Sequence, residues 1–341
     1  MYDPHIRMEA AQNIDSDYVL LDVRSPGEYQ RGHIPGAISF PLFTDEERAI
    51  VGTLYKQSGK DAAVLEGLRI VGPKMAGFVE EAARLSPQRK VKLHCWRGGM
   101  RSMSVAWLLQ QGGFSTQVIK GGYKAYRTEV QQFLCEPFPF KVISGATGSR
   151  KTKILQALKI LGEQVIDLEG LAHHKGSAFG SLGMEAQPSI EQFENELHQQ
   201  LKSMDLNRTI WVEDESRKIG TIVLLEGFWK RIKSVPVYLI QLSLEERVKF
   251  LVEEYGAFSK DELQNSVQKI AKRLGGQNLN AALEALEAGD LSAVAAISLH
   301  YYDKAYRYAL ETRQAQIAHQ LVIDGLSHRE IAEKIIQLEQ K

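Results

Sequence analysis

Two loops of this 341-residue chain combine residue types that bind anions, and one of them also carries a thiol. The first loop follows His94, and its candidate reactive residues are Cys95, Arg97 and Arg101. The second loop, at residues 145–152, is rich in small residues and contains Lys151. A thiol can act as a nucleophile, and backbone N–H groups of a glycine-rich loop can hold phosphate. The two loops together predict sulfur-family or phosphorus-family chemistry at Cys95, coupled to a phosphorylated ligand near Lys151.

The elements expected around Cys95 make its thiol a candidate nucleophile. An apolar run at 91–94 predicts a strand, and the apolar spacing of 102–109 predicts a helix. The thiol would then lie at a helix N-terminus, where backbone N–H groups and the two arginines favour the thiolate. Such a thiolate could attack a sulfur, selenium or phosphorus centre while Arg101 and the N–H groups hold the oxyanion. A buried cysteine in an ordinary strand-to-helix turn is the alternative.

The second loop has the pattern of a P-loop, placed between an expected strand at 141–144 and an expected helix at 153–161. Backbone N–H groups would hold a diphosphate, Lys151 would supply a positive charge, and the Thr152 hydroxyl would be available to Mg²⁺. Arg150 replaces the usual glycine before the lysine, so the pattern predicts diphosphate binding but not nucleotide hydrolysis. The candidate diphosphate-binding residues are Gly145, Thr147, Gly148, Ser149, Arg150, Lys151 and Thr152. A glycine-rich turn without a ligand is the alternative.

Polar residues at the ends of two further expected strands form a candidate substrate or metal edge. These residues are Asp167, Glu213, Asp214, Glu215 and Ser216, with His174 in the loop that follows Asp167. Paired histidines beside a lysine and glycines fit a substrate loop better than a metal site, because no third ligand has suitable spacing. The sequence therefore predicts no definite metal ligand, and a solvated strand end remains the alternative.

Composition limits the classes of function. The 42 basic residues balance the 42 acidic ones, so contact with a nucleic acid has to come from a local patch. No apolar run approaches the roughly 20 residues that span a bilayer, so we expect no membrane association. The chain has only two cysteines, and the one placed after a strand and before glycines is better interpreted as reactive than as disulfide-bonded. A cytoplasmic protein is expected.

Short apolar runs alternate with helical patterns, which predicts an α/β fold with parallel sheets. The expected strands are 18–23, 91–94, 115–119, 141–144, 164–168, 209–212 and 235–242. Two prolines at 137 and 139 resist both helix and central strand, so we place a domain boundary there. The expected domains are 1–136, and 137–341 with a doubly wound P-loop NTPase-like core and a helical C-terminal region from about 245.

Several segments of the first 130 residues resemble the rhodanese family. They are residues 21–29, 32–37, 41–42 and 121–123. The resemblance implies a rhodanese-like parallel-sheet domain in which Cys95 forms a persulfide or perselenide. It also implies that Asp22, Arg24, Glu28 and His33 hold the scaffold. Five residues lie between Cys95 and Arg101, one more than rhodaneses usually have there. This longer loop also matches cysteine-dependent phosphatases, and it would suit a tetrahedral donor such as selenophosphate.

Further segments resemble the family of tRNA 2-selenouridine synthases, in which a rhodanese domain precedes a P-loop domain. They are residues 44–56, 167–180, 213–216, 273–277 and 301–303. The resemblance implies that selenium from selenophosphate replaces sulfur at C2 of the wobble 2-thiouridine of tRNA. It also implies transfer of a geranyl group from geranyl diphosphate to that sulfur, giving an S-geranyl intermediate that selenium displaces. No tightly bound cofactor is expected.

Within this interpretation Cys95 handles selenium, Arg97 and Arg101 bind the donor, and Lys151 with Thr152 binds the diphosphate. Whether Cys95 carries selenium covalently or only orients the donor stays open. Other functions stay open as well. They are a nucleotide-regulated cysteine-dependent phosphatase, a plain sulfurtransferase, and a noncatalytic adaptor.

Overall fold

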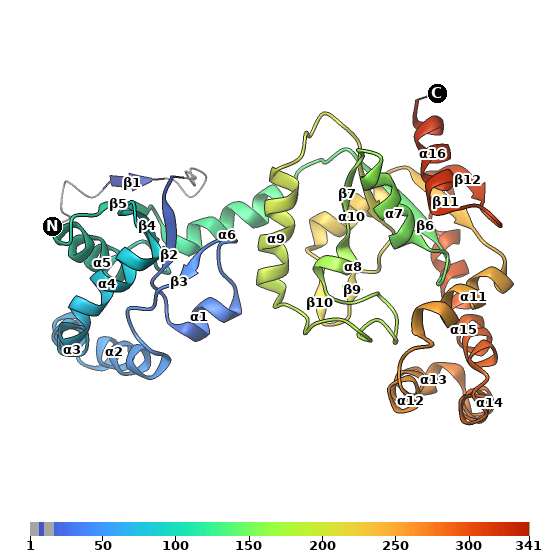
Figure 1. Ribbon diagram of the computed structural model, residues 1–341, viewed down its shortest axis with the longest axis horizontal. Coiled ribbons are helices and arrows are strands. Elements are labelled where there is room, and N and C mark those ends of the chain that lie inside the picture. The colour runs from blue at the N-terminus through green and yellow to red at the C-terminus, as the bar shows by residue number, and fades with distance from the viewer. Residues whose placement is uncertain (1–6, 10–16, 341) are drawn as a thin grey trace. The chain divides into compact units, whose positions relative to one another are not determined.

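The computed structural model describes residues 7–9 and 17–340, and the chain forms two compact units (Figure 1). Unit 1 consists of Met1–Phe133 with Glu194–Glu196, and unit 2 consists of Leu134–Phe193 with Leu197–Lys341. None of the helices in the described ranges is both long enough and apolar enough to span a membrane.

Unit 1 is built on a parallel five-stranded sheet in the order β1-β5-β4-β2-β3. The strands are β1 (Arg7–Glu9), β2 (Val19–Asp22), β3 (Ile38–Ser39), β4 (Lys90–His94) and β5 (Ser115–Ile119). The helices are α1 (Pro26–Arg31), α2 (Asp45–Gln57), α3 (Lys60–Val71), α4 (Met75–Leu85), α5 (Met100–Gln111) and α6 (Gly122–Phe133), with a 3-10 turn at Gly72–Lys74. The chain adds β3 on one side of β2 and β4 on the other. The carboxyl ends of β2 and β4 therefore form a switch point, where open α/β sheets bind ligands.

Unit 2 has its own parallel five-stranded sheet, in the order β12-β11-β6-β8-β7. The strands are β6 (Phe140–Gly145), β7 (Gln164–Ile166), β8 (Ile210–Glu213), β11 (Val237–Gln241) and β12 (Ile317–Val322), and β9 (Lys218–Ile219) pairs with β10 (Ile222–Val223) in a small hairpin. The helices beside this sheet are α7 (Lys151–Ile160), α8 (Leu168–Leu171), α9 (Ile190–Lys202), α10 (Glu226–Ser234) and α16 (His328–Glu339). Strand β6 lies in the middle of the order, so the loop that follows it is at the switch point of this sheet.

A group of helices is inserted between β11 and β12 (Figure 1). They are α11 (Leu244–Tyr255), α12 (Lys260–Lys269), α13 (Ala271–Leu274), α14 (Gly276–Glu287) and α15 (Leu291–Glu311), with a 3-10 turn at Gln314–Gln316. The side chains of Ser243, Ser259 and Asp290 cap the N-termini of α11, α12 and α15. These helices share an apolar core of their own, which includes Leu263, Val267, Leu286 and Val294.

The α/β class with parallel sheets and each of the seven expected strands are confirmed, within a few residues at the ends. The strand expected at 164–168 ends at Ile166, because the Asp167 carboxylate accepts a hydrogen bond from the Gly170 N–H (2.7 Å) and starts α8. Strands β1, β3, β9, β10 and β12 were not predicted. Four of them have two or three residues, too few for a periodic pattern, and β12 is a partly exposed edge strand with polar residues.

Candidate functional sites

The Cys95 loop lies between the end of β4 and the start of α5. Its curvature depends on close backbone contact, since a Cβ atom at Gly122 would lie 2.3 Å from the Cys95 carbonyl oxygen. Gly98 adopts φ 62°, a left-handed conformation that glycine allows without steric cost. The Cys95 Sγ atom lies 3.3 Å from the Ser102 hydroxyl, and 3% of the residue is exposed. The thiol is thus not enclosed by hydrocarbon alone, but a ligand has to enter the loop to reach it.

The two arginines of this loop differ in their surroundings. Arg101 donates a hydrogen bond to the Glu28 carboxylate (2.7 Å), whereas Arg97 is exposed and has no ion-pair partner in the described part of unit 1. Although burial raises the pKa of Glu28, the pair with Arg101 outweighs it, so the pKa is below its ordinary value. Arg101 can therefore hold a donor anion only by sharing or exchanging Glu28, while Arg97 is free to meet the anion directly.

Asp22 and Arg24 form a buried ion pair beneath the loop, with 2.6 Å between Nη2 and Oδ2. The Arg24 guanidinium also donates to the Gly32 carbonyl and lies 3.8 Å from the ring centroid of Tyr123. Burial lowers the pKa of His94 to about 4, so its ring is neutral at physiological pH. Because Asp22 and Arg24 bond to each other and are shielded from solvent, their contacts are those of a scaffold.

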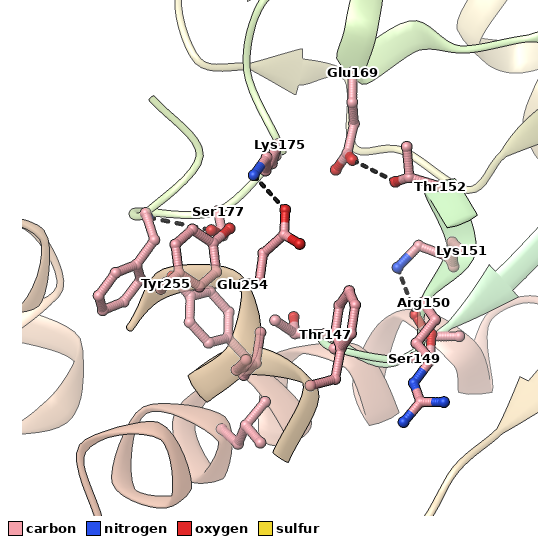
Figure 2. A pocket seen from close by; sticks show the side chains of 18 of the residues that line it. Thr147, Ser149, Arg150, Lys151, Thr152, Glu169, Lys175, Ser177, Glu254 and Tyr255 are labelled. Carbon is pink, nitrogen blue, oxygen red and sulfur yellow. Dashed lines mark hydrogen bonds and ion pairs between the residues drawn. The ribbon is translucent and has the colours of Figure 1, made fainter. Parts of the chain in front are cut away.

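The loop between β6 and α7 has the arrangement of a phosphate cradle (Figure 2). Lys151 begins α7 and donates from Nζ to the Gly145 carbonyl (3.0 Å), which holds its ammonium group beside the loop. Ser149 is 1% exposed, and its hydroxyl has no hydrogen-bond partner in the described part of the chain. The first N–H groups of a helix also lack partners within the helix. Unsatisfied donors beside an ammonium group are what an anionic ligand requires.

Arg150 contributes its backbone to the cradle, while its side chain is directed elsewhere. Its guanidinium donates to the Glu246 carboxylate (2.9 Å) and lies 5.7 Å from the ring centroid of Phe250. Figure 2 shows this guanidinium pointing away from Glu169 and Lys175. The backbone of Arg150 has φ 63° and ψ 24°, the left-handed conformation that the usual glycine adopts without strain.

This backbone conformation gives a first prediction. Arg150→Gly is expected to be more stable than Arg150→Ala by about 1 to 2 kcal/mol, because both variants lose the Glu246 pair but only glycine relieves the left-handed strain. Urea unfolding of both variants, followed by a probe in unit 2, measures the difference in the free energy of unfolding. Equal stability of the two variants would show that residue 150 is not strained.

The structure brings most, but not all, of the candidate edge residues to the cradle. One cavity of about 580 Å³ is lined by all seven candidate diphosphate-binding residues together with Asp167, Asp214, Glu215 and Ser216. Glu213 is fully buried beneath it and accepts a hydrogen bond from the Glu169 N–H (2.8 Å). His174 does not line this cavity, and its ring packs beside Gly180. Glu213 and His174 are thus placed to support the site and not to contact its ligand.

The carboxylates of this edge are already engaged by protein groups. Asp214 accepts hydrogen bonds from Ser144, Lys233 and Arg313, and Glu169 accepts one from the Thr152 hydroxyl (2.9 Å). Across the described ranges, no group of three or more His, Cys, Asp or Glu side chains is arranged to hold a metal ion. The sequence predicts that the Thr152 hydroxyl is available to Mg²⁺. In this structure the hydroxyl donates its hydrogen bond to Glu169 instead.

The protonation of Glu215 gives a second prediction. Burial, together with the nearby Glu169, raises the pKa of Glu215 to about 8, whereas Lys151 opposes the rise. Glu215 is therefore neutral at pH 7 and negatively charged at pH 9, where it repels a diphosphate. We expect the affinity for inorganic diphosphate to fall above pH 8, by up to about tenfold per pH unit.

Calorimetric titration between pH 6.5 and 9.5 measures this dependence. The matched variant Glu215→Gln keeps a neutral side chain at every pH and should bind with nearly constant affinity. The same loss of affinity in both proteins would assign the titration to another group.

The wall of the cavity opposite the cradle residues is mostly apolar, and local sequence patterns do not predict it. This wall comes from α11, α12 and α15, and its members include Phe250, Leu251, Leu263, Leu291, Val294 and Leu299. Leu263, Leu291 and Val294 also belong to the apolar core of the helical group. The cavity thus extends from the phosphate cradle into the core of the inserted helices. These residues are 98 or more positions from the cradle, and their spacing alone is that of ordinary core positions.

The loop after α8 links the cradle to this wall. Lys175 pairs with Glu254 (2.5 Å), and the Ala178 N–H donates to the Tyr302 hydroxyl (2.9 Å). In Figure 2 the pair of Lys175 and Glu254 lies across the pocket from Lys151 and Thr152. The loop residues 175–177 and 179 line the cavity, and the function of this segment as a substrate loop stays a prediction.

Two family models match the chain. One is described as a rhodanese-like domain and matches residues 7–129, and the other is described as the AAA domain of tRNA 2-selenouridine synthase and matches residues 138–334. The folds and the two anion loops thus define a protein in which a rhodanese-like unit precedes a P-loop unit.

Relatives named tRNA 2-selenouridine synthase match nearly the whole chain. The relative from Marinobacter nauticus is 34% identical, with 89% of this chain and 91% of the relative covered. The relatives from Shewanella woodyi (32% identical; 92% and 95% covered) and Cronobacter sakazakii (35% identical; 91% and 92% covered) are comparable. The chain belongs to the tRNA 2-selenouridine synthase family.

Proposed function

We propose that this protein is a cytoplasmic transferase that acts on tRNA and replaces sulfur by selenium at C2 of the wobble 2-thiouridine. Geranyl diphosphate first alkylates the sulfur, and selenium from selenophosphate then displaces the S-geranyl group. The observation that carries this proposal is the cavity of about 580 Å³ in unit 2, in which a phosphate cradle continues into an apolar wall. A nucleotide has no hydrocarbon chain to cover such a wall, whereas an allylic diphosphate has both parts.

In the first step the sulfur atom of 2-thiouridine attacks C1 of the geranyl group. A carbon–sulfur bond forms, the bond between C1 and the diphosphate oxygen breaks, and N3 of the base loses its proton. The departing diphosphate gains negative charge, which Lys151 and the N–H groups at the start of α7 stabilise. Alkylation also converts sulfur into a better leaving group for the second step.

In the second step the selenium atom of selenophosphate attacks C2, so that a carbon–selenium bond forms, the carbon–sulfur bond breaks and the S-geranyl group leaves as geranyl thiol. Water then cleaves the phosphorus–selenium bond and releases phosphate and the selenouridine. We assign the selenium donor to the loop of Cys95, because selenophosphate is a tetrahedral oxyanion and the loop presents glycine-rich backbone beside Arg97. Cys95 orients the donor, because uptake of its selenium as a perselenide would require a two-electron oxidant. The buried ion pair of Asp22 and Arg24 keeps the loop in shape for this role.

The experiment that tests the function is mass analysis of tRNA nucleosides from cells with and without this protein. We expect 2-selenouridine to disappear without it while 2-thiouridine persists. Unchanged nucleosides would remove the proposal and favour a phosphatase or an adaptor, neither of which depends on tRNA, selenium or geranyl diphosphate.

A further inference from the structure

One face of α15 runs along the cavity from the cradle to its apolar end. Four residues at intervals of four positions line the cavity, namely Tyr306, Tyr302, Ser298 and Val294. Residues spaced in this way lie one above another on a helix, about one turn or 6 Å apart. The cavity therefore has a repeated spacing along its length.

The two ends of this row differ in character. The Tyr306 hydroxyl lies 3.2 Å from the Ser144 hydroxyl, and Ser144 directly precedes the cradle glycine Gly145. At the other end Val294 is 5% exposed and belongs, with Leu263, to the core of the inserted helices. Tyr306 thus marks the diphosphate end of the cavity, and Val294 with Leu263 marks the closed end.

An isoprene unit adds four bonds along a hydrocarbon chain, which span about 5 Å when extended. This length is close to one turn of α15, so each further isoprene unit of a bound chain would reach about one residue farther along the row. A chain that starts from a diphosphate near Tyr306 would place its first unit beside Tyr302 and its second beside Ser298. A third unit would meet Val294 and Leu263.

We propose that α15 selects the prenyl chain length, with Ser298 making room for the second isoprene unit and Val294 excluding a third. The inference rests on the proposed function and adds the residues that determine which allylic diphosphate is used. Ser298 acts through its small volume in a wall of larger side chains. Its buried hydroxyl has no hydrogen-bond partner among the residues that the structure describes, so no protein contact requires a serine there.

The test uses the full chain and tRNA that contains wobble 2-thiouridine. Dimethylallyl, geranyl and farnesyl diphosphates are supplied together at equal concentration, and the S-prenyl nucleosides are quantified by mass spectrometry. The ratio of products does not depend on how much enzyme is folded, so a loss of stability in a variant does not distort the result. The wild-type protein should favour the geranyl product.

Ser298→Phe should shift the ratio of dimethylallyl to geranyl product upward by about tenfold or more, because the ring occupies the site of the second unit. Val294→Ala should raise the ratio of farnesyl to geranyl product by a similar factor. Ser298→Ala keeps the small volume and should retain the wild-type ratios. A shift in the stated direction in either of the first two variants supports the inference.

Wild-type geranyl transfer with unchanged or oppositely shifted ratios in both Ser298→Phe and Val294→Ala would overturn the chain-length inference alone. Absence of transfer from all three diphosphates by the wild-type protein would overturn the proposed alkylation step, and the inference with it.

Discussion

Lys151→Ala is expected to lower the rate of geranyl transfer to tRNA by about 100- to 1,000-fold. The Lys151 ammonium lies beside the loop that lines the cavity, and in the proposed mechanism its positive charge stabilises the negative charge that develops on the departing diphosphate. Alanine leaves the helix intact but removes this charge from the place where the bond breaks. Purified enzyme, 2-thiouridine tRNA and geranyl diphosphate, with the S-geranyl nucleoside quantified by mass spectrometry, give the rate.

Lys159→Ala is the matched control, since Lys159 is an exposed residue of the same helix α7 and does not line the cavity. This variant should react like the wild-type protein. Lys151→Ala should also convert tRNA that already carries the S-geranyl group into selenouridine tRNA at a normal rate, because the second step of the proposed mechanism does not use the cradle. An unchanged geranylation rate in Lys151→Ala would remove the cradle from the mechanism.

Cys95→Ala is expected to spare geranyl transfer and to reduce selenium incorporation to background, so that S-geranyl tRNA accumulates. Cys95 carries the thiol of the anion loop in unit 1. It does not line the cavity of unit 2, so the substitution leaves the residues of that cavity unchanged. The measurement supplies geranyl diphosphate and selenophosphate together and follows the S-geranyl and selenouridine nucleosides over time.

Cys135→Ala provides the comparison, because Cys135 is the other cysteine and is exposed. Its product distribution should match that of the wild-type protein. Equal loss of both steps in Cys95→Ala and in Lys151→Ala would contradict this division between the two loops. Full retention of selenation in Cys95→Ala would indicate that the loop only binds an anion.

Much of the fold could be predicted because its sheets leave a strong pattern. The central strands are short apolar runs that end in glycine or polar residues, and this pattern locates both anion loops at strand ends. The helical insertion was predicted only in part, because β12 returns to the sheet as an edge strand with a weak apolar pattern. An edge strand has a neighbouring strand on one side only, so fewer of its residues are buried and its apolar pattern is weaker. Its sequence is therefore harder to distinguish from that of a surface helix.

In the candidate sites, local motifs could be predicted from the sequence, whereas contacts between residues that are distant in the sequence could not. The P-loop pattern predicts a diphosphate cradle, because that motif is local and its backbone geometry follows from a few consecutive residues. It does not predict that Glu246 engages the Arg150 guanidinium, or that Glu28 engages Arg101. These partners lie 96 and 73 positions away, and which charges meet at such separations depends on the packing of whole elements.

By itself the sequence determined the α/β class, the order of the two anion loops and the residue types that each loop presents, because all three follow from local patterns. Only the tertiary structure decided what surrounds those loops. It joined the cradle to an apolar wall from α11, α12 and α15, and it buried Glu215 beside Glu169. Cavities and shifted pKa values arise where segments that are distant in the sequence pack together and exclude water. The periodicity of a sequence does not predict which distant segments pack together.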